Sequence, residues 1–211
     1  RLLIIRHGES EADILKVHEG RADFSLTDRG QSQALAMANY LKENYSIDRI
    51  YSSTLKRAKE TAYHLSDAFD IEIILEEDLM EFNNGLLAGL PFEEAALKYP
   101  KVENLSLDQS VYGMESKLEF RNRAERILSK IIKEQGEEDT VAIISHGGMI
   151  NQLYMSFLKV NPGESIVFTT GDTGIHEWKI TDGIQYIKKA NILDHIKGIV
   201  FGRIESSQRG S

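Results

Sequence analysis

An arginine and a histidine stand side by side at the end of the first apolar run of the chain. Residues 2–5 are four consecutive apolar residues, which predict a short strand buried on both faces, and Arg6-His7-Gly8 follows directly. A guanidinium can hold phosphate or carboxylate oxygens in pairs, and an imidazole beside it can act as a nucleophile, a base or a ligand. The alternative interpretation is a polar strand end with no function.

The same pattern returns in the second half of the chain. Residues 140–145 predict another strongly apolar strand, His146 follows it, and Gly147-Gly148 open a helix. The carboxyl ends of strands in an open α/β sheet border the ligand crevice, so both histidines are expected there. The glycines would let backbone N–H groups at the helix start face an anion.

Two more charged residues follow predicted strands. Arg57 falls in the first turn of a helix that Ser53 or Thr54 is expected to cap. A cation at this position opposes the helix dipole, and either a bound anion or simple solvation would account for it. Glu81 ends an acidic run, residues 76–81, behind a strand predicted over residues 71–75.

The other elements alternate between strands and helices. The predicted strands lie at residues 2–5, 48–52, 71–75, 140–145, 165–170, 174–180 and 184–190, with a hairpin turn at Asp182-Gly183. Further helix starts are predicted at Thr27, at Pro91 and at the capping box of Ser116 and Glu119. Residues 10–27 are expected to form a long loop beside the crevice. This order predicts a three-layer α/β/α fold whose mostly parallel central sheet has an antiparallel edge.

Composition restricts the partners of the chain. The 211 residues predict a single domain, 1–211, with a peripheral tail from about residue 203. A net charge of -8 disfavours nucleic acid and anionic membranes, and no apolar run approaches the roughly 20 residues of a membrane span. The absence of cysteine fits a reducing cytoplasm. Because the sequence begins at Arg1, residues upstream of it are expected. The oligomeric state is left open, with a homodimer as one alternative.

Taken together, these segments resemble the histidine phosphatase superfamily, the phosphoglycerate-mutase-like proteins. The resemblance follows the family's order along roughly residues 1–190. The residues that carry it are Arg6-His7-Gly8-Glu9, Gly20-Arg21 with Ser25-Leu26-Thr27, the stretch 52–62 with Arg57, Glu81 ahead of Gly85 and Gly89, and Ser145-His146-Gly147-Gly148.

The resemblance implies a metal-independent phosphomonoesterase that needs no cofactor and acts on a small-molecule phosphomonoester. His7 would attack phosphorus while its other ring nitrogen donates to a backbone carbonyl. Arg6, Arg57 and His146 would hold the phosphoryl oxygens, where the transition-state charge develops. Glu81 would protonate the leaving oxygen and then activate water. Acidic neighbours, if close, would help to raise the pKa of Glu81.

Four more residues are candidate contacts of the phosphate or substrate. Gly20, Arg21 and Gly147 match the family's pattern. Asp13 stands where similar proteins often carry asparagine, and a carboxylate repels phosphate unless it is protonated or turned away, so Asp13 is a doubtful contact. The remaining histidines, His18, His64, His176 and His195, match no motif and are expected to be surface or packing residues.

Three functions compete, and we favour the phosphatase. A phosphoglycerate mutase must also bind a carboxylate, but residues 81–89 contain no basic residue and the next cation is Lys98. Phe82, Leu86 and Leu87 would offer an apolar wall there or belong to the core. A non-catalytic phosphate-binding module would be expected to have lost His7 or Glu81. A zinc site made of His7, His146 and Glu81 is disfavoured, because two arginines would repel the ion.

Overall fold

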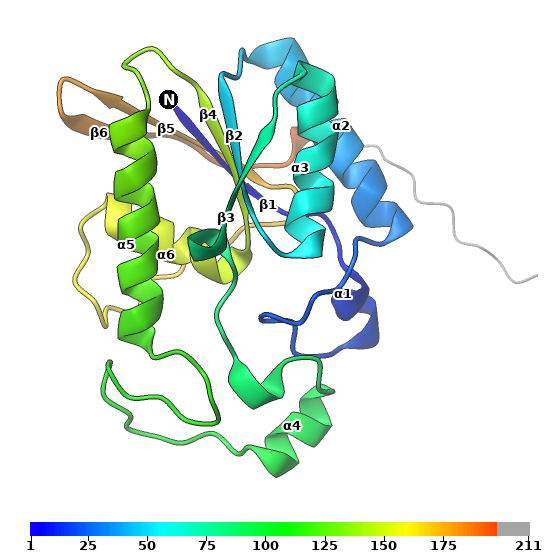
Figure 1. Ribbon diagram of the computed structural model, residues 1–211, viewed down its shortest axis with the longest axis vertical. Coiled ribbons are helices and arrows are strands. Elements are labelled where there is room, and N and C mark those ends of the chain that lie inside the picture. Colours follow the sequence, from blue (N-terminus) through cyan, green and yellow to red (C-terminus); the bar gives the residue numbers. More distant parts are fainter. Residues whose placement is uncertain (198–211) are drawn as a thin grey trace, which may run out of the picture.

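The computed structural model describes residues 1–197, and its centre is a six-stranded sheet with the order β3-β2-β4-β1-β5-β6 (Figure 1). The strands are β1 (Leu2–Arg6), β2 (Arg49–Ser53), β3 (Ile73–Glu76), β4 (Val141–Ser145), β5 (Ile175–Thr181) and β6 (Ile184–Ile192). The first four are parallel, and β5 and β6 form an antiparallel edge. The tail predicted from about residue 203 lies outside the described residues.

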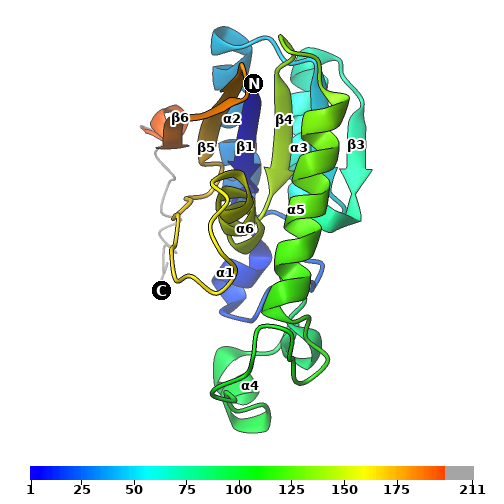
Figure 2. The ribbon, with the colours of Figure 1, turned by 90° about the vertical axis from the view of Figure 1, so that its left-hand side faces the viewer.

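Long helices cover both faces of the sheet (Figure 2). On one face lie α2 (Asp28–Asn44) and α3 (Lys56–Phe69), and on the other lie α5 (Lys117–Glu134) and α6 (Gly147–Phe157). Successive side chains of a strand point to opposite faces, so β1 contributes Leu3 and Ile5 to one core and Leu2 and Ile4 to the other. The predicted three-layer α/β/α fold is confirmed.

The helix starts predicted at Thr27, Ser116 and Gly147 are confirmed, and the cap predicted at Ser53 or Thr54 is wrong. The helix predicted from Pro91 is present but begins one residue later, at Phe92, with Pro91 as its N-cap. The Thr27 hydroxyl accepts a hydrogen bond from Gly30 N at 3.0 Å, and Ser116 and Glu119 form the predicted capping box. Helix α3, in contrast, begins after Leu55 rather than at Ser53 or Thr54. Instead, the Ser53 hydroxyl lies 2.8 Å from Nε2 of the His146 ring, so this serine contacts a predicted site residue rather than capping a helix.

The strand predicted at 165–170 is wrong, although the hairpin after it is confirmed. The Asn151 side chain on α6 donates to Ile166 O at 3.2 Å and accepts from Phe168 N at 2.8 Å, in place of strand pairing. Strand β6 already occupies the outer side of β5, so the sheet offers this segment no partner there. The hairpin turn has positive φ at Asp182 (51°) and Gly183 (75°).

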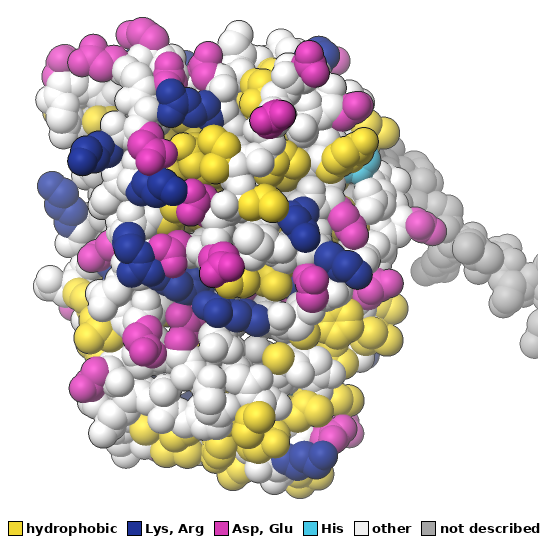
Figure 3. Space-filling model, viewed as in Figure 1, with side chains coloured by type: hydrophobic (Ala, Val, Ile, Leu, Met, Phe, Trp, Pro, Cys, Tyr) yellow, Lys and Arg dark blue, Asp and Glu magenta, His cyan; other side chains and the backbone are white. Residues whose placement is uncertain are grey.

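Short elements cover the carboxyl ends of the parallel strands (Figure 1). They are α1 (Glu11–Leu15), inside the predicted loop 10–27, together with α4 (Phe92–Lys98) and the 3₁₀ turns Glu77–Leu79 and Gly85–Leu87; a third 3₁₀ turn, Asp194–Ile196, follows β6. Figure 3 shows hydrophobic side chains gathered at the α4 end of one face. Within residues 1–197, no helix has both the length and the apolar character that crossing a bilayer requires.

Candidate active site

The two histidines meet at the carboxyl ends of the central strands. His7 follows β1 and His146 follows β4, and these strands are parallel neighbours with Arg6 opposite Ser145. The ring centroids of the two histidines lie 5.0 Å apart, and both side chains are buried. The pairing of β1 with β4 therefore brings residues 139 positions apart into one cluster, as the sequence predicts.

One ring nitrogen of His7 is engaged and the other faces the cluster. Nδ1 lies 2.7 Å from Gly8 O, and because a carbonyl oxygen only accepts, Nδ1 carries the proton. Nε2 therefore holds a lone pair, and it lies 3.3 Å from Arg57 Nε. Burial, followed by the charges of Arg57 and Arg6, lowers the pKa of His7 well below its ordinary value. This environment favours a neutral imidazole whose unprotonated Nε2 accepts from Arg57 Nε.

The lowered pKa predicts that His7 stays neutral in mildly acidic solution. An ordinary histidine becomes mostly protonated as the pH falls below about 6.5, whereas a group with a depressed pKa remains neutral. We expect the ring nitrogens of His7 to report the neutral, Nδ1-protonated form at about pH 5.5. Long-range ¹H–¹⁵N correlation spectra test this, with His7→Ala to assign the signal. An imidazolium spectrum at that pH would contradict the prediction.

Three basic side chains surround His7, and we call Arg6, Arg57 and His146 the donor cluster. Arg57 is fully buried at the start of α3, where Nη2 donates to Gly20 O at 2.9 Å and Nη1 to Ala22 O at 3.0 Å. Arg6 Nη1 donates to Thr170 O at 3.0 Å. These backbone contacts fix the guanidinium groups in place.

Two buried nitrogens of the donor cluster lack a hydrogen-bond partner within the described residues. They are Arg6 Nε and His146 Nδ1. The Ser53 hydroxyl lies 2.8 Å from His146 Nε2, and when it donates to that atom the proton of the ring resides on Nδ1. Buried polar groups are nearly always satisfied in native proteins, so two unsatisfied nitrogens in one cluster indicate the place of an anionic ligand.

Glu81 reaches the same cluster from the segment after β3. Its Oε2 accepts from Gly148 N at 2.8 Å and its Oε1 from Phe82 N at 2.7 Å. A Cβ on residue 148 would lie 2.4 Å from Glu81 Oε1, so the close approach of this carboxylate requires glycine there. The second glycine of the predicted Gly147-Gly148 pair thus holds the carboxylate beside the start of α6.

An internal ion pair that sequence reasoning missed holds the backbone on both sides of Glu81. Arg123 on α5 donates from Nη2 to Glu81 O at 2.8 Å and from Nη1 to Met80 O at 2.5 Å. The same guanidinium pairs with Glu115 at 2.7 Å, and Glu115 accepts from Asn83 N at 2.6 Å. Arg123 and Glu115 therefore fix the segment that carries the Glu81 carboxylate.

We expect Arg123→Met to destabilise the fold by about 3–5 kcal/mol, because it removes the close ionic partner of the largely buried Glu115 and the donor to the backbone carbonyls of Met80 and Glu81. Glu115 is then left with the more distant Arg21, at 4.0 Å. Arg126→Met is the matched control on the same helix. Arg126 is largely exposed and pairs with Asp78, so its loss is expected to cost at most about 1 kcal/mol. Urea unfolding followed by circular dichroism measures both variants. Equal losses would contradict the role assigned to Arg123.

The other predicted site residues are Gly147, Gly20, Arg21 and Asp13. Gly147 opens α6 beside Arg6, and a Cβ on it would lie 4.0 Å from Arg6 Nε. The Gly20 carbonyl accepts from Arg57, whereas the Arg21 side chain lies 4.0 Å from Glu115. Asp13 accepts from Ser10 N at 2.9 Å and so caps α1, which turns its carboxylate toward the backbone.

Two of the acidic neighbours of Glu81 pair with basic residues of α5. Asp78 pairs with Arg126 at 2.6 Å, and Glu76 pairs with Lys130. Phe82 is partly buried and packs against the core, with its ring 5.3 Å from that of Phe120, whereas Leu86 is exposed. No group of three or more His, Cys, Asp or Glu side chains in residues 1–197 is arranged to hold a metal ion.

The four histidines outside the motifs have packing contacts. His18 meets the ring of Phe92 edge-on, and His64 bonds Gln31 at 2.8 Å. His176 forms hydrogen bonds with the hydroxyl groups of Tyr154 and Thr170, and His195 with that of Thr173. Burial lowers the pKa of both His176 and His195 to about 4.

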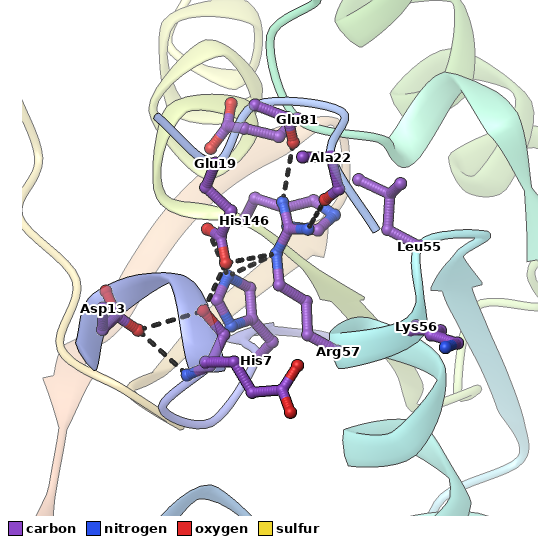
Figure 4. Close-up of polar contacts among 12 residues, drawn as sticks. His7, Asp13, Glu19, Ala22, Leu55, Lys56, Arg57, Glu81 and His146 are labelled. Carbon is purple, nitrogen blue, oxygen red and sulfur yellow. Dashed lines mark hydrogen bonds and ion pairs between the residues drawn. The ribbon is translucent and has the colours of Figure 1, made fainter. Parts of the chain in front are cut away.

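A second acidic residue, Glu19, enters the cluster without having been predicted. Its Oε1 lies 3.1 Å from Arg57 Nε and its Oε2 lies 3.7 Å from His7 Nε2 (Figure 4). In the sequence, Glu19 is one of several acids in a polar stretch. Its position next to the motif residues Gly20-Arg21 is the one signal that could have drawn attention to it.

Comparison with known proteins identifies the family. A model of the histidine phosphatase superfamily (branch 1) matches residues 2–193. Phosphoserine phosphatase 1 of Hydrogenobacter thermophilus is 28% identical over 200 residues, which cover 93% of this chain and 94% of that protein. The 2,3-bisphosphoglycerate-dependent phosphoglycerate mutase of Bartonella tribocorum is 32% identical over 184 residues, which cover 82% and 88%.

A solved structure agrees with both the family and the fold. The crystal structure of phosphoserine phosphatase from Entamoeba histolytica, in complex with 3-phosphoglyceric acid, superposes with a TM-score of 0.74 at 28% identity and covers 92% of this chain and 98% of that one. The chain therefore belongs to the histidine phosphatase superfamily. The predicted family, fold and phosphatase class of enzyme are confirmed.

Proposed function

We propose that this protein hydrolyses small-molecule phosphomonoesters in two steps through a phosphohistidine on His7. The observation that carries the proposal is the state of the His7 ring. Its Nδ1 is engaged by Gly8 O, its Nε2 carries the lone pair and accepts from Arg57 Nε at 3.3 Å, and unsatisfied nitrogens of Arg6 and His146 lie in the same buried cluster. A nucleophile beside pre-arranged donors is what phosphoryl transfer requires, because positioning and charge stabilisation provide most of the catalysis.

In the first step, His7 Nε2 forms a bond to phosphorus while the bond from phosphorus to the ester oxygen breaks. The donor cluster binds the non-bridging oxygens and stabilises the negative charge that spreads over them. Protonated Glu81 gives its proton to the departing oxygen, which leaves as an alcohol. The step ends with phosphohistidine and the Glu81 carboxylate.

In the second step, the Glu81 carboxylate takes a proton from water as the water oxygen attacks phosphorus. The bond from phosphorus to Nε2 breaks, inorganic phosphate leaves, and Glu81 is protonated again. Arg123 and Glu115 support both steps by fixing the backbone of Glu81. The net reaction consumes one phosphomonoester and one water and yields an alcohol and phosphate.

Hydrolysis is favoured over the mutase reaction by the surroundings of Glu81. Mutases of this family carry basic residues just after the glutamate that matches Glu81, and residues 81–89 contain none. Arg21 is the proposed contact for an anionic group on the substrate, since its Nε has no hydrogen-bond partner in residues 1–197. The relatives named for phosphoserine and phosphoglycerate support a small phosphorylated acid as a substrate class. The single domain and the cytoplasmic location stay predictions.

A panel of phosphorylated metabolites tests the function directly. We expect phosphate release from at least one phosphomonoester, with no loss of activity in a chelator. The panel includes 3-phosphoglycerate with 2,3-bisphosphoglycerate, whose interconversion with 2-phosphoglycerate is followed at the same time. Interconversion that outpaces phosphate release would support the mutase instead.

A further inference from the structure

The Glu19 carboxylate contacts the two groups that a substrate phosphoryl group would need first. Its Oε1 lies 3.1 Å from Arg57 Nε, and its Oε2 lies 3.7 Å from the nucleophilic Nε2 of His7 (Figure 4). Ser10 also donates its hydroxyl to Oε1. An anion from the chain itself therefore lies against His7 and one member of the donor cluster.

This position cannot be shared with a substrate. Attack by His7 requires a phosphorus atom about 3–3.5 Å from Nε2, and its oxygens must reach Arg57 as well. The two oxygens of Glu19, at 3.7 Å from that nitrogen and 3.1 Å from Arg57 Nε, already make the contacts that the phosphoryl group needs. Two anions in one place would also repel each other strongly in a buried site.

The backbone of residue 19 is held on both sides, so the side chain is the part that can move. His18 N donates to Leu90 O at 2.8 Å, Gly89 N donates to His18 O at 2.7 Å, and Gly20 O accepts from Arg57 at 2.9 Å. Rotation about side-chain bonds withdraws the carboxylate and leaves these contacts intact.

The carboxylate satisfies only part of the site. It has two oxygens, and with Glu19 in place Arg6 Nε and His146 Nδ1 still lack a hydrogen-bond partner within the described residues. A phosphoryl group has three non-bridging oxygens and can reach all three members of the donor cluster. Burial raises the pKa of Glu19 in spite of the opposing effect of Arg57, so this position holds the charged carboxylate weakly.

We propose that Glu19 is an internal competitor, which occupies the phosphoryl position of the free enzyme until an anion with more hydrogen-bonding oxygens displaces it. This inference rests on the proposed function, because it takes the donor cluster to be the phosphate site. The consequence is selectivity: phosphomonoesters displace Glu19, whereas simple carboxylates offer the donor cluster nothing that Glu19 does not already provide.

Binding of inorganic phosphate, measured by isothermal titration calorimetry, tests the inference without turnover. If the withdrawn side chain is populated at about 1–10% in the free protein, Glu19→Gln and Glu19→Ala should bind phosphate about 10- to 100-fold more tightly than the wild type. Glu11→Gln is the matched control, since Glu11 carries the same charge, belongs to the same 10–27 segment and bonds Ser25 N outside the donor cluster. It should bind like the wild type.

Formate provides a second readout, because it can refill the space that Glu19→Ala vacates. Added formate should weaken phosphate binding to Glu19→Ala and leave that of the wild type nearly unchanged. Equal effects of formate on both proteins would contradict the inference.

The outcomes separate the inference from the proposed function. Phosphate binding by the wild type that is lost in Arg57→Ala but is equal or weaker in Glu19→Gln would overturn the internal competitor and leave the phosphatase standing. If neither the wild type nor the Glu19 variants bind phosphate, both proposals fail.

Discussion

His7→Ala is expected to lower kcat/KM by at least about 10,000-fold on every substrate that the wild type hydrolyses. The imidazole is the proposed nucleophile, and removal of a nucleophile abolishes the covalent route and leaves only what binding and charge stabilisation can supply. The fold should survive, because alanine removes a ring that makes one backbone hydrogen bond, to Gly8 O. Steady-state phosphate release measures the effect.

The control for this variant is His64→Ala. His64 lies on α3 and bonds Gln31, away from the donor cluster, so its loss should change kcat/KM less than about twofold. Residual activity of His7→Ala within about 100-fold of the wild type would mean that water attacks phosphorus directly. That result would contradict the two-step mechanism.

Glu81→Gln should lose far more activity on an alkyl phosphate than on p-nitrophenyl phosphate. Glutamine cannot give a proton to a leaving alkoxide, whose conjugate alcohol is a very weak acid, while p-nitrophenolate leaves with little help. We expect a loss of about 100- to 10,000-fold on the alkyl substrate, in line with general acid catalysis. Measurement of kcat/KM on both substrates gives the ratio.

Arg57→Ala supplies the contrast. Its guanidinium would stabilise the phosphoryl oxygens whatever group leaves. In Arg57→Ala, kcat/KM should therefore fall by about 100- to 1,000-fold on both substrates, as for the loss of one oxyanion donor. Equal losses in Glu81→Gln across the two leaving groups would show that Glu81 is not the acid, and the role would have to pass to another group.

The features that could be predicted from the sequence are the buried strands and the charged residues that follow them. Two apolar runs, each followed by a histidine, predict neighbouring parallel strands, and the structure pairs Arg6 with Ser145 directly before the two rings. The order of charged residues after strands then places Arg57 and Glu81 in the same cluster. These features are local in sequence, so they can be recognised without a structure.

The features that could not be predicted depend on long-range contacts. Glu19 lies in the site because the segment around it is bound by Arg57 and Leu90, and no periodic pattern encodes those contacts. Arg123 resembles any other arginine of a polar helix until its partners near Glu81 are known. The segment 165–170 has a strand-like composition, but Asn151 binds its backbone and the edge of the sheet is already occupied.

Trapping the phosphorylated intermediate decides whether His7 is the nucleophile. The wild type is mixed with an excess of substrate, quenched in alkali during turnover, and analysed by mass spectrometry for phosphorylated peptides. We expect one phosphoryl group on His7, stable in base and lost in acid, and none in His7→Ala. The group should be on Nε2, because Nδ1 is held by Gly8 O. Full turnover with no phosphorylated peptide, or with the phosphoryl group on another residue, would contradict it.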